Sequence, residues 1–162
     1  MNQELRKINE LVLDNIACSE SDKPEILSFI DETLRGRLTK PLVFCGEPAT
    51  GKTFAAKMIS LLINGNSDIE CVTVKSHNSK PVIVIDNIDQ NDFDELCRQG
   101  LKIHARSNLL ITGIELDVVD KPIIFNKENQ NEYFDFTNII SAIRKERSSI
   151  LNSYQFTGIK II

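Results

Sequence analysis

Residues 46–53 read GEPATGKT, and this octapeptide constrains the fold more than any other stretch of the chain. A short apolar run, LVFC at 42–45, precedes it and has the pattern of a buried strand. An amphipathic pattern typical of a helix begins at Gly51 and ends at Asn64-Gly65. The spacing G-x-x-x-x-G-K-T between a strand and a helix predicts a loop that wraps the phosphates of a nucleotide.

Each position of the motif has a physical task. Gly46 and Gly51 allow backbone angles and close approaches that a Cβ atom would forbid. The N–H groups of the loop and the positive end of the following helix attract a phosphate, and Lys52 adds a point charge. The hydroxyl of Thr53 is placed to bind Mg²⁺. We expect the nucleotide to be held by Gly46, Glu47, Pro48, Ala49, Thr50, Gly51, Lys52, Thr53 and Phe54.

An aspartate ends a second apolar strand, VIVID at 82–86. If this strand is parallel to the first, Asp86 lies at the carboxyl edge of the sheet, beside the phosphate loop. A carboxylate at that edge serves as a Mg²⁺ ligand, usually through water. Thr53 and Asp86 are therefore the predicted metal ligands.

The remaining patterns predict alternating strands and helices, which indicates an α/β fold with a mainly parallel sheet. Only about five residues separate two of the strands, and a parallel crossover needs roughly a dozen. Either those two strands form an antiparallel hairpin, or one of them is not a strand. The expected helices cover 3–17, 24–35, 51–64, 91–99 and 137–153, and the expected strands cover 42–45, 69–75, 82–86, 108–114 and 122–126.

The length of 162 residues favours one domain. We divide it into a helical N-terminal extension (1–38), a nucleotide-binding core (39–126) and a C-terminal helix and strand (127–162). No apolar run approaches the ~20 residues that would span a bilayer, and the N-terminus alternates charged and apolar residues, unlike a secretory signal. Four scattered cysteines favour reduced thiols in a cytoplasmic protein.

The net charge of −4 argues against binding of the whole surface to nucleic acid. The C-terminal residues 137–162 are locally basic, however, with Arg144, Lys145, Arg147 and Lys160 against Glu146. This basic region is therefore a candidate surface for binding a nucleic-acid or protein partner.

The segments G46-E-P-A-T-G-K-T53 and V82-I-V-I-D-N-I-D89 resemble the Walker A and Walker B motifs of AAA+ ATPases and of the related superfamily 3 helicases. Pro48 and Thr50 add to the resemblance, because those families often carry G-x-P-x-T-G-K-[ST]. The resemblance covers about residues 40–114. It implies a three-layer P-loop NTPase sandwich that binds ATP and Mg²⁺, assembles with further copies of itself, and acts on nucleic acid or protein.

The chain departs from these families after the Walker B aspartate, where they usually carry a glutamate that polarises the attacking water. Asn87 stands there and cannot act as a base, although an amide can orient water. The candidate acids to substitute for the glutamate are Asp89, Glu47 and Glu115. The resemblance also implies a polar sensor at Thr112 and offers Arg144 and Arg147 as arginine fingers for a neighbouring subunit.

Three alternatives remain beside an ATPase with weak or partner-stimulated hydrolysis. An ATP-sensing adaptor with little turnover is favoured by Asn87. A GTPase is suggested by Asn126-Lys127-Glu128-Asn129, although the guanine-binding carboxylate is replaced by Asn129. A small-molecule kinase would suit the length, with RKER at 144–147 as an arginine-rich lid.

Overall fold

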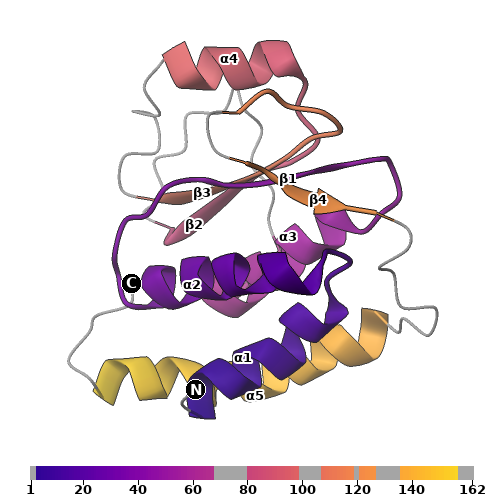
Figure 1. The fold of residues 1–162 in the computed structure, drawn as a ribbon. Helices are drawn as coiled ribbons and strands as arrows, with labels where there is room; N and C mark the ends of the chain where they lie inside the picture. Colours follow the sequence, from indigo (N-terminus) through magenta and orange to yellow (C-terminus); the bar gives the residue numbers. More distant parts are fainter. Residues whose placement is uncertain (1–2, 68–79, 99–106, 119–120, 127–135, 157–162) are drawn as a thin grey trace.

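The computed structural model describes residues 3–67, 80–98, 107–118, 121–126 and 136–156 (Figure 1). The strand expected at 69–75, the hairpin it would form and the strand expected near the C-terminus lie outside these residues. The described elements, in chain order, are α1 (Gln3–Leu11), α2 (Lys23–Leu34), β1 (Leu42–Gly46), α3 (Lys52–Asn64), β2 (Val82–Ile85), α4 (Gln90–Arg98), β3 (Asn108–Thr112), β4 (Ile123–Phe125) and α5 (Phe136–Phe156), with 3-10 turns at Leu13–Asn15 and Glu20–Asp22.

The four described strands form one sheet in the order β2-β3-β1-β4, and every neighbouring pair is parallel. Leu42 of β1 lies opposite Leu110 of β3, and Val82 of β2 lies opposite Asn108. Strands β2 and β3 are buried along their whole length, as expected for strands covered on both faces. The predicted α/β fold with a parallel sheet is confirmed for this part of the chain.

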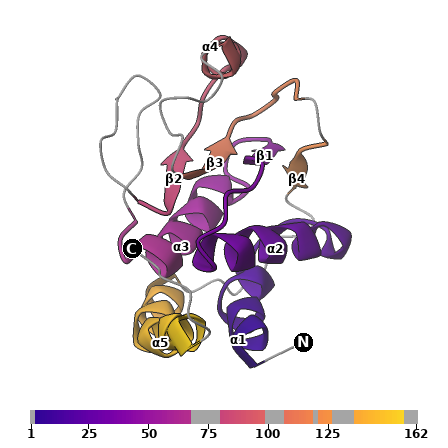
Figure 2. The same cartoon turned by 90° about the vertical axis from the view of Figure 1, so that its left-hand side faces the viewer.

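Helices cover both faces of the sheet (Figure 2). Leu42 and Phe44 of β1 point to the face packed by α2 and α3, with α1 and α5 outside them, and Val43 and Cys45 point to the face packed by α4. This layering is compatible with a three-layer sandwich. None of the helices in the described ranges is long and apolar enough to cross a membrane.

The first helix is shorter than the predicted range of 3–17. Helix α1 ends at Leu11, and a single 3-10 turn follows at Leu13–Asn15. The amide Nδ2 of Asn15 donates to the carbonyl O of Leu11 at 2.9 Å and so satisfies an acceptor at the helix end. Asparagine competes for backbone groups in this way, which explains why the apolar pattern alone overestimated the helix.

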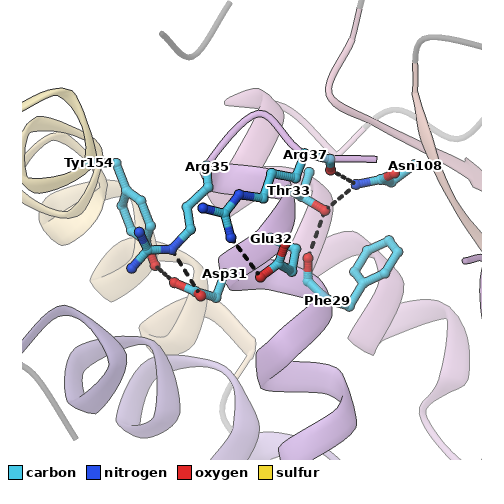
Figure 3. Close-up of polar contacts among 8 residues, drawn as sticks. All are labelled: Phe29, Asp31, Glu32, Thr33, Arg35, Arg37, Asn108 and Tyr154. Carbon is cyan, nitrogen blue, oxygen red and sulfur yellow. Dashed lines mark hydrogen bonds and ion pairs between the residues drawn. The ribbon is translucent and has the colours of Figure 1, made fainter. Parts of the chain in front are cut away.

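Asn108, the first residue of β3, is buried and fixes the connection between α2 and β1 (Figure 3). Its Nδ2 donates to Thr33 Oγ1 at 2.8 Å and to the carbonyl O of Arg37 at 2.9 Å. Its Oδ1 accepts the N–H of Thr39 at 2.8 Å. Hydrogen bonds therefore use both ends of the buried amide and join the N-terminal helices to the sheet.

Asp31 joins α2 to α5 on the other side of the same helix (Figure 3). Tyr154 Oη donates to Asp31 Oδ1 at 2.6 Å, and Arg35 Nε donates to Asp31 Oδ2 at 3.1 Å. The guanidinium carbon of Arg35 lies 5.5 Å from the centroid of the Tyr154 ring. Burial, and the hydrogen bond to Asp31, raise the pKa of Tyr154 above its ordinary value.

Candidate functional site

The loop between β1 and α3 has a backbone that demands glycine at its base. Gly46 has φ +145°, and a Cβ atom there would lie 2.3 Å from the carbonyl O of Phe125 at the end of β4. Gly51, the residue before α3, has φ +91°. The expectation of unusual backbone angles is met at both glycines, whereas the expected close approach is met at Gly46 alone, where the neighbour is the backbone of β4; a Cβ atom at Gly51 would meet nothing within 4 Å.

Lys52 is buried inside this loop. Its ammonium Nζ donates to the carbonyl O atoms of Gly46 at 2.7 Å and Glu47 at 2.6 Å. Burial lowers the pKa of Lys52, an effect opposed by the nearby Cys45 and Asp86. The loop therefore curls around a cationic group held by its own carbonyls.

Thr50 fastens the loop, a role that the motif alone did not reveal. Its side chain is 1% exposed, and Oγ1 donates to the carbonyl O of Glu47 at 2.8 Å. The intervening Pro48 and Ala49 are exposed, and Ala49 has the positive φ of +63° that non-glycine residues rarely adopt. The loop is thus a short closed turn whose tip, at Glu47, Pro48 and Ala49, faces outward.

Thr53 and Asp86 meet at the carboxyl edge of the sheet, although 32 residues separate them in the chain. Thr53, in the first turn of α3, places Oγ1 2.9 Å from Asp86 Oδ1 and 3.0 Å from Oδ2. Asp86 directly follows β2. The pairing predicted from the two sequence segments is present, even though β3 lies between β1 and β2.

Thr112, at the end of β3, completes this cluster from the strand between them. Its Oγ1 donates to Asp86 Oδ1 at 2.6 Å and accepts the backbone N–H of Asn87 at 2.7 Å. Asn87 itself is exposed and has φ +55°. The ends of two parallel strands and the start of one helix therefore bring the side chains of Thr53, Asp86 and Thr112 into one hydrogen-bonded group.

The oxygen atoms of this group suit a magnesium ion. Adjacent ligands of an octahedral Mg²⁺ lie about 3 Å apart when each is 2.0–2.1 Å from the metal, which matches the separation of Thr53 Oγ1 from Asp86. Within the described residues no three His, Cys, Asp or Glu side chains gather to form a metal cage. Mg²⁺ usually keeps several waters and takes only one or two protein carboxylates, so a pair such as Thr53 and Asp86 fits it better than a closed cage would.

The other candidate groups lie elsewhere or have structural roles. Asp89 Oδ1 accepts the N–H of Asp92 at 2.8 Å, which makes it a cap at the start of α4. Glu47 and Glu115 are exposed. Arg147 donates to the carbonyl O atoms of Leu62 at 2.9 Å and Ile63 at 3.1 Å, at the opposite end of α3 from Lys52.

Two expectations from sequence are therefore revised. Asp89, a candidate for the catalytic acid, caps helix α4. Arg147, a candidate arginine finger, bonds carbonyls of its own chain, whereas the other candidate, Arg144, is exposed. Of the guanine-like segment, only Asn126 lies within the described residues, where it is exposed and its N–H donates to the carbonyl O of Ala17 at 3.4 Å.

No protein-family model matches the chain, and neither a curated protein nor a solved structure matches it. The functional argument therefore depends on the sequence motifs and on the geometry of the site.

Proposed function

We propose that this chain is a P-loop NTPase that binds Mg-ATP and hydrolyses it slowly or when stimulated by a partner. The observation that carries the proposal is the placement of three groups around one loop. Lys52 lies inside residues 46–51, and Thr53 and Asp86 converge beside them. Each group has the chemistry that its sequence motif demands: a cation for the phosphates and two hard oxygens for Mg²⁺.

The loop and the start of α3 would hold the phosphates. Gly51 precedes the helix and provides no side-chain cap, so phosphate oxygens can take the place of a capping group at this N-terminus. Lys52 would exchange its carbonyl acceptors in the loop for phosphate oxygens, which are stronger acceptors because they carry charge. The helix dipole and Lys52 then act on the same anion.

Mg²⁺ bound at Thr53 and Asp86 would neutralise charge on the phosphates. Thr112 acts through Asp86, because its one hydroxyl proton already bonds Asp86 Oδ1 and is not available to a phosphate. Asn87, one residue beyond the metal carboxylate, would orient the attacking water by its amide. An amide does not remove a proton, so turnover without a stimulating partner is expected to be slow.

The test is binding and turnover of Mg-ATP by the wild-type chain and by Lys52→Ala. Loss of the ammonium should weaken binding about 10- to 100-fold, the range for a hydrogen bond to a charged group. Lys57→Ala is the matched control, because Lys57 is an exposed lysine on the same helix. Equal affinity in the wild type and Lys52→Ala would refute the proposed site.

A second candidate function is an ATP-sensing adaptor that binds nucleotide and hardly turns it over. The observation that favours it is Asn87, exposed and without the carboxylate of a general base. Asn87→Gly separates the two candidates, because glycine adopts φ +55° and removes only the amide. Measurable hydrolysis that falls in Asn87→Gly with unchanged ATP affinity indicates the ATPase. Tight binding without turnover in both proteins indicates the adaptor.

The proposal includes a stimulating partner and a cytoplasmic location. A nucleic-acid or protein partner, or further copies of this chain, would supply the stimulation, and ATPase rates with and without single-stranded DNA test the first of these. Cys18, Cys45 and Cys97 are free thiols, which favours a reducing, cytoplasmic location. Measuring GTP beside ATP, and phosphate transfer to small acceptors, tests the GTPase and kinase alternatives.

A further inference from the structure

Two phenylalanine rings lie against each other at the start of α3, next to the phosphate loop. Phe54 directly follows Thr53, and its ring packs edge to face with Phe136, with centroids 4.1 Å apart and planes at 83°. Phe136 is the first residue of α5 and is 51% exposed. An exposed aromatic ring beside a polar binding loop is a common feature of ligand sites.

The pair lies at the end of α3 that adjoins the loop. Phe54 is in the first turn of the helix, where Cα–Cβ bonds tilt toward the N-terminus, and it also packs against the main core. Its contact places Phe136 at the same end of α3. In Figure 1 the first turns of α3 and α5 lie at the same side of the molecule, where β1 and β4 end.

We propose that Phe54 and Phe136 form a stacking platform for the base of the bound nucleotide, an inference that rests on the proposed function. The base is covalently tied to the phosphates, so a nucleotide in the loop must place its nucleoside just outside residues 46–53. Phe54 is the next residue along the chain. Phe136 adds aromatic surface that still faces solvent.

Stacking on an aromatic ring does not select one base, because every base has a π-face. The platform should therefore strengthen the binding of any nucleoside triphosphate relative to bare triphosphate, without distinguishing adenine from guanine. The phosphate loop and the platform make separable contributions: the loop acts on the phosphates and the platform on the base.

Phe136 is the residue to change. Phe54 also packs against the main core, so its removal would disturb the fold, whereas half of the Phe136 surface is already exposed. The experiment is calorimetric titration of wild-type chain, Phe136→Ala and Phe136→Tyr with ATP, GTP and inorganic tripolyphosphate, each with Mg²⁺. Leu38→Ala is the matched control, because Leu38 is also an exposed apolar residue, 66% exposed, but lies far from the loop. Its neighbours Arg37 and Thr39 bond Asn108 at the amino end of β3, whereas the candidate site is at the carboxyl end.

Phe136→Ala should weaken ATP and GTP alike by about 5- to 100-fold, the range for loss of one base–aromatic stack. Its affinity for tripolyphosphate should not change, Phe136→Tyr should retain nucleotide affinity, and Leu38→Ala should behave as wild type. Unchanged ATP affinity in Phe136→Ala, or equal weakening of all three ligands, would overturn the platform and leave the phosphate site standing. Wild-type chain that binds neither tripolyphosphate nor ATP would instead refute the proposed function and this inference with it.

Discussion

Thr112 donates a short hydrogen bond to Asp86, 2.6 Å from the threonine Oγ1 to the aspartate Oδ1. The same hydroxyl oxygen accepts the N–H of Asn87 at 2.7 Å. Thr112 is 1% exposed, so no solvent replaces either bond. One buried hydroxyl thus fixes both the carboxylate and the backbone that follows it.

Replacing Thr112 by valine should disturb Asp86, one of the two proposed Mg²⁺ ligands. The substitution keeps the shape but leaves the Asn87 N–H without its acceptor and removes one hydrogen bond to Asp86, which keeps its contacts with Thr53. This loss should cost about 1–3 kcal/mol in the free energy of unfolding. Affinity for Mg-ATP should fall, while affinity for ATP in excess EDTA should stay unchanged. Calorimetry under both conditions checks this, with Thr112→Ser as the control that keeps the hydroxyl. A Thr112→Val protein that loses affinity equally with and without Mg²⁺ would contradict the positioning role.

Asn87 has a left-handed backbone conformation, and this determines how much each substitution at the position should change the stability of the fold. At φ +55° glycine has no steric cost. Asparagine has a small cost, because its short polar side chain can hydrogen-bond locally, whereas alanine, which cannot, costs about 1 kcal/mol. We therefore expect Asn87→Gly to match or exceed the wild type in urea-induced unfolding and Asn87→Ala to be less stable by about 1 kcal/mol. Equal stabilities of the two variants would argue against a strained backbone at this position.

Arg147 is expected to be a stability residue. Its guanidinium bonds the carbonyls of Leu62 and Ile63, which end α3 and have no further helical donor. Arg147→Ala should lower the free energy of unfolding by about 2 kcal/mol, because bonds to a charged group are lost and two carbonyls are left without them. Arg144→Ala, an exposed arginine of the same helix, should change stability little. An ATPase defect in Arg147→Ala with undiminished stability would restore the arginine-finger role.

The affinity for Mg-ATP should depend on pH through Lys52. Burial lowers the pKa of Lys52 below its ordinary value of 10.5, and phosphates bind the charged form. Affinity should therefore fall as pH rises through this lowered pKa, before pH 10.5 is reached. Lys52→Arg stays charged throughout and should bind with little change over the same range. A wild-type affinity that stays flat up to pH 10.5 would contradict the assignment.

Tyr154 should make the fold sensitive to alkali. Its pKa is raised by burial and by Asp31, so the folded chain holds the phenol proton more tightly than the unfolded chain does. The stability from this group is complete below the ordinary pKa of 10 and is lost as pH rises above it. In a Tyr133→Phe background, tyrosinate absorbance should therefore appear together with loss of helical circular dichroism. Ionisation near pH 10 in a chain that stays folded would show that Tyr154 is more accessible than its contacts indicate.

Local patterns were sufficient to predict most of the described fold. Four strand segments and the helices α2, α3 and α4 lie within a few residues of their predicted ranges, because strong apolar runs and glycine boundaries define them. The pairing of Thr53 with Asp86 also followed, since the carboxyl ends of parallel strands share one edge.

Long-range contacts were beyond the reach of the sequence. Nothing local shows that β3 lies between β1 and β2, so the bond from Thr112 to Asp86 could not be derived. Arg147 looked like a surface cation because its acceptors are backbone carbonyls more than 80 residues away, and carbonyls leave no signal in a sequence. The aromatic contact between Phe54 and Phe136 likewise depends on how α5 packs.

Strand β3 carries a buried polar residue at each end, Asn108 and Thr112, with three aliphatic residues between them. Asn108 accepts a hydrogen bond from Thr39, in the segment that leads into β1, and Thr112 donates one to the carboxylate of Asp86, which follows β2. A slip of one residue along the sheet would remove both side chains from their partners at once and turn the aliphatic residues to the wrong faces. The length of β3 therefore sets the distance between the hydrogen bonds of Asn108 to the segment before β1 and the hydrogen bond of Thr112 to Asp86. Inserting or deleting one residue within 109–111 should therefore separate at least one of the two side chains from its partners.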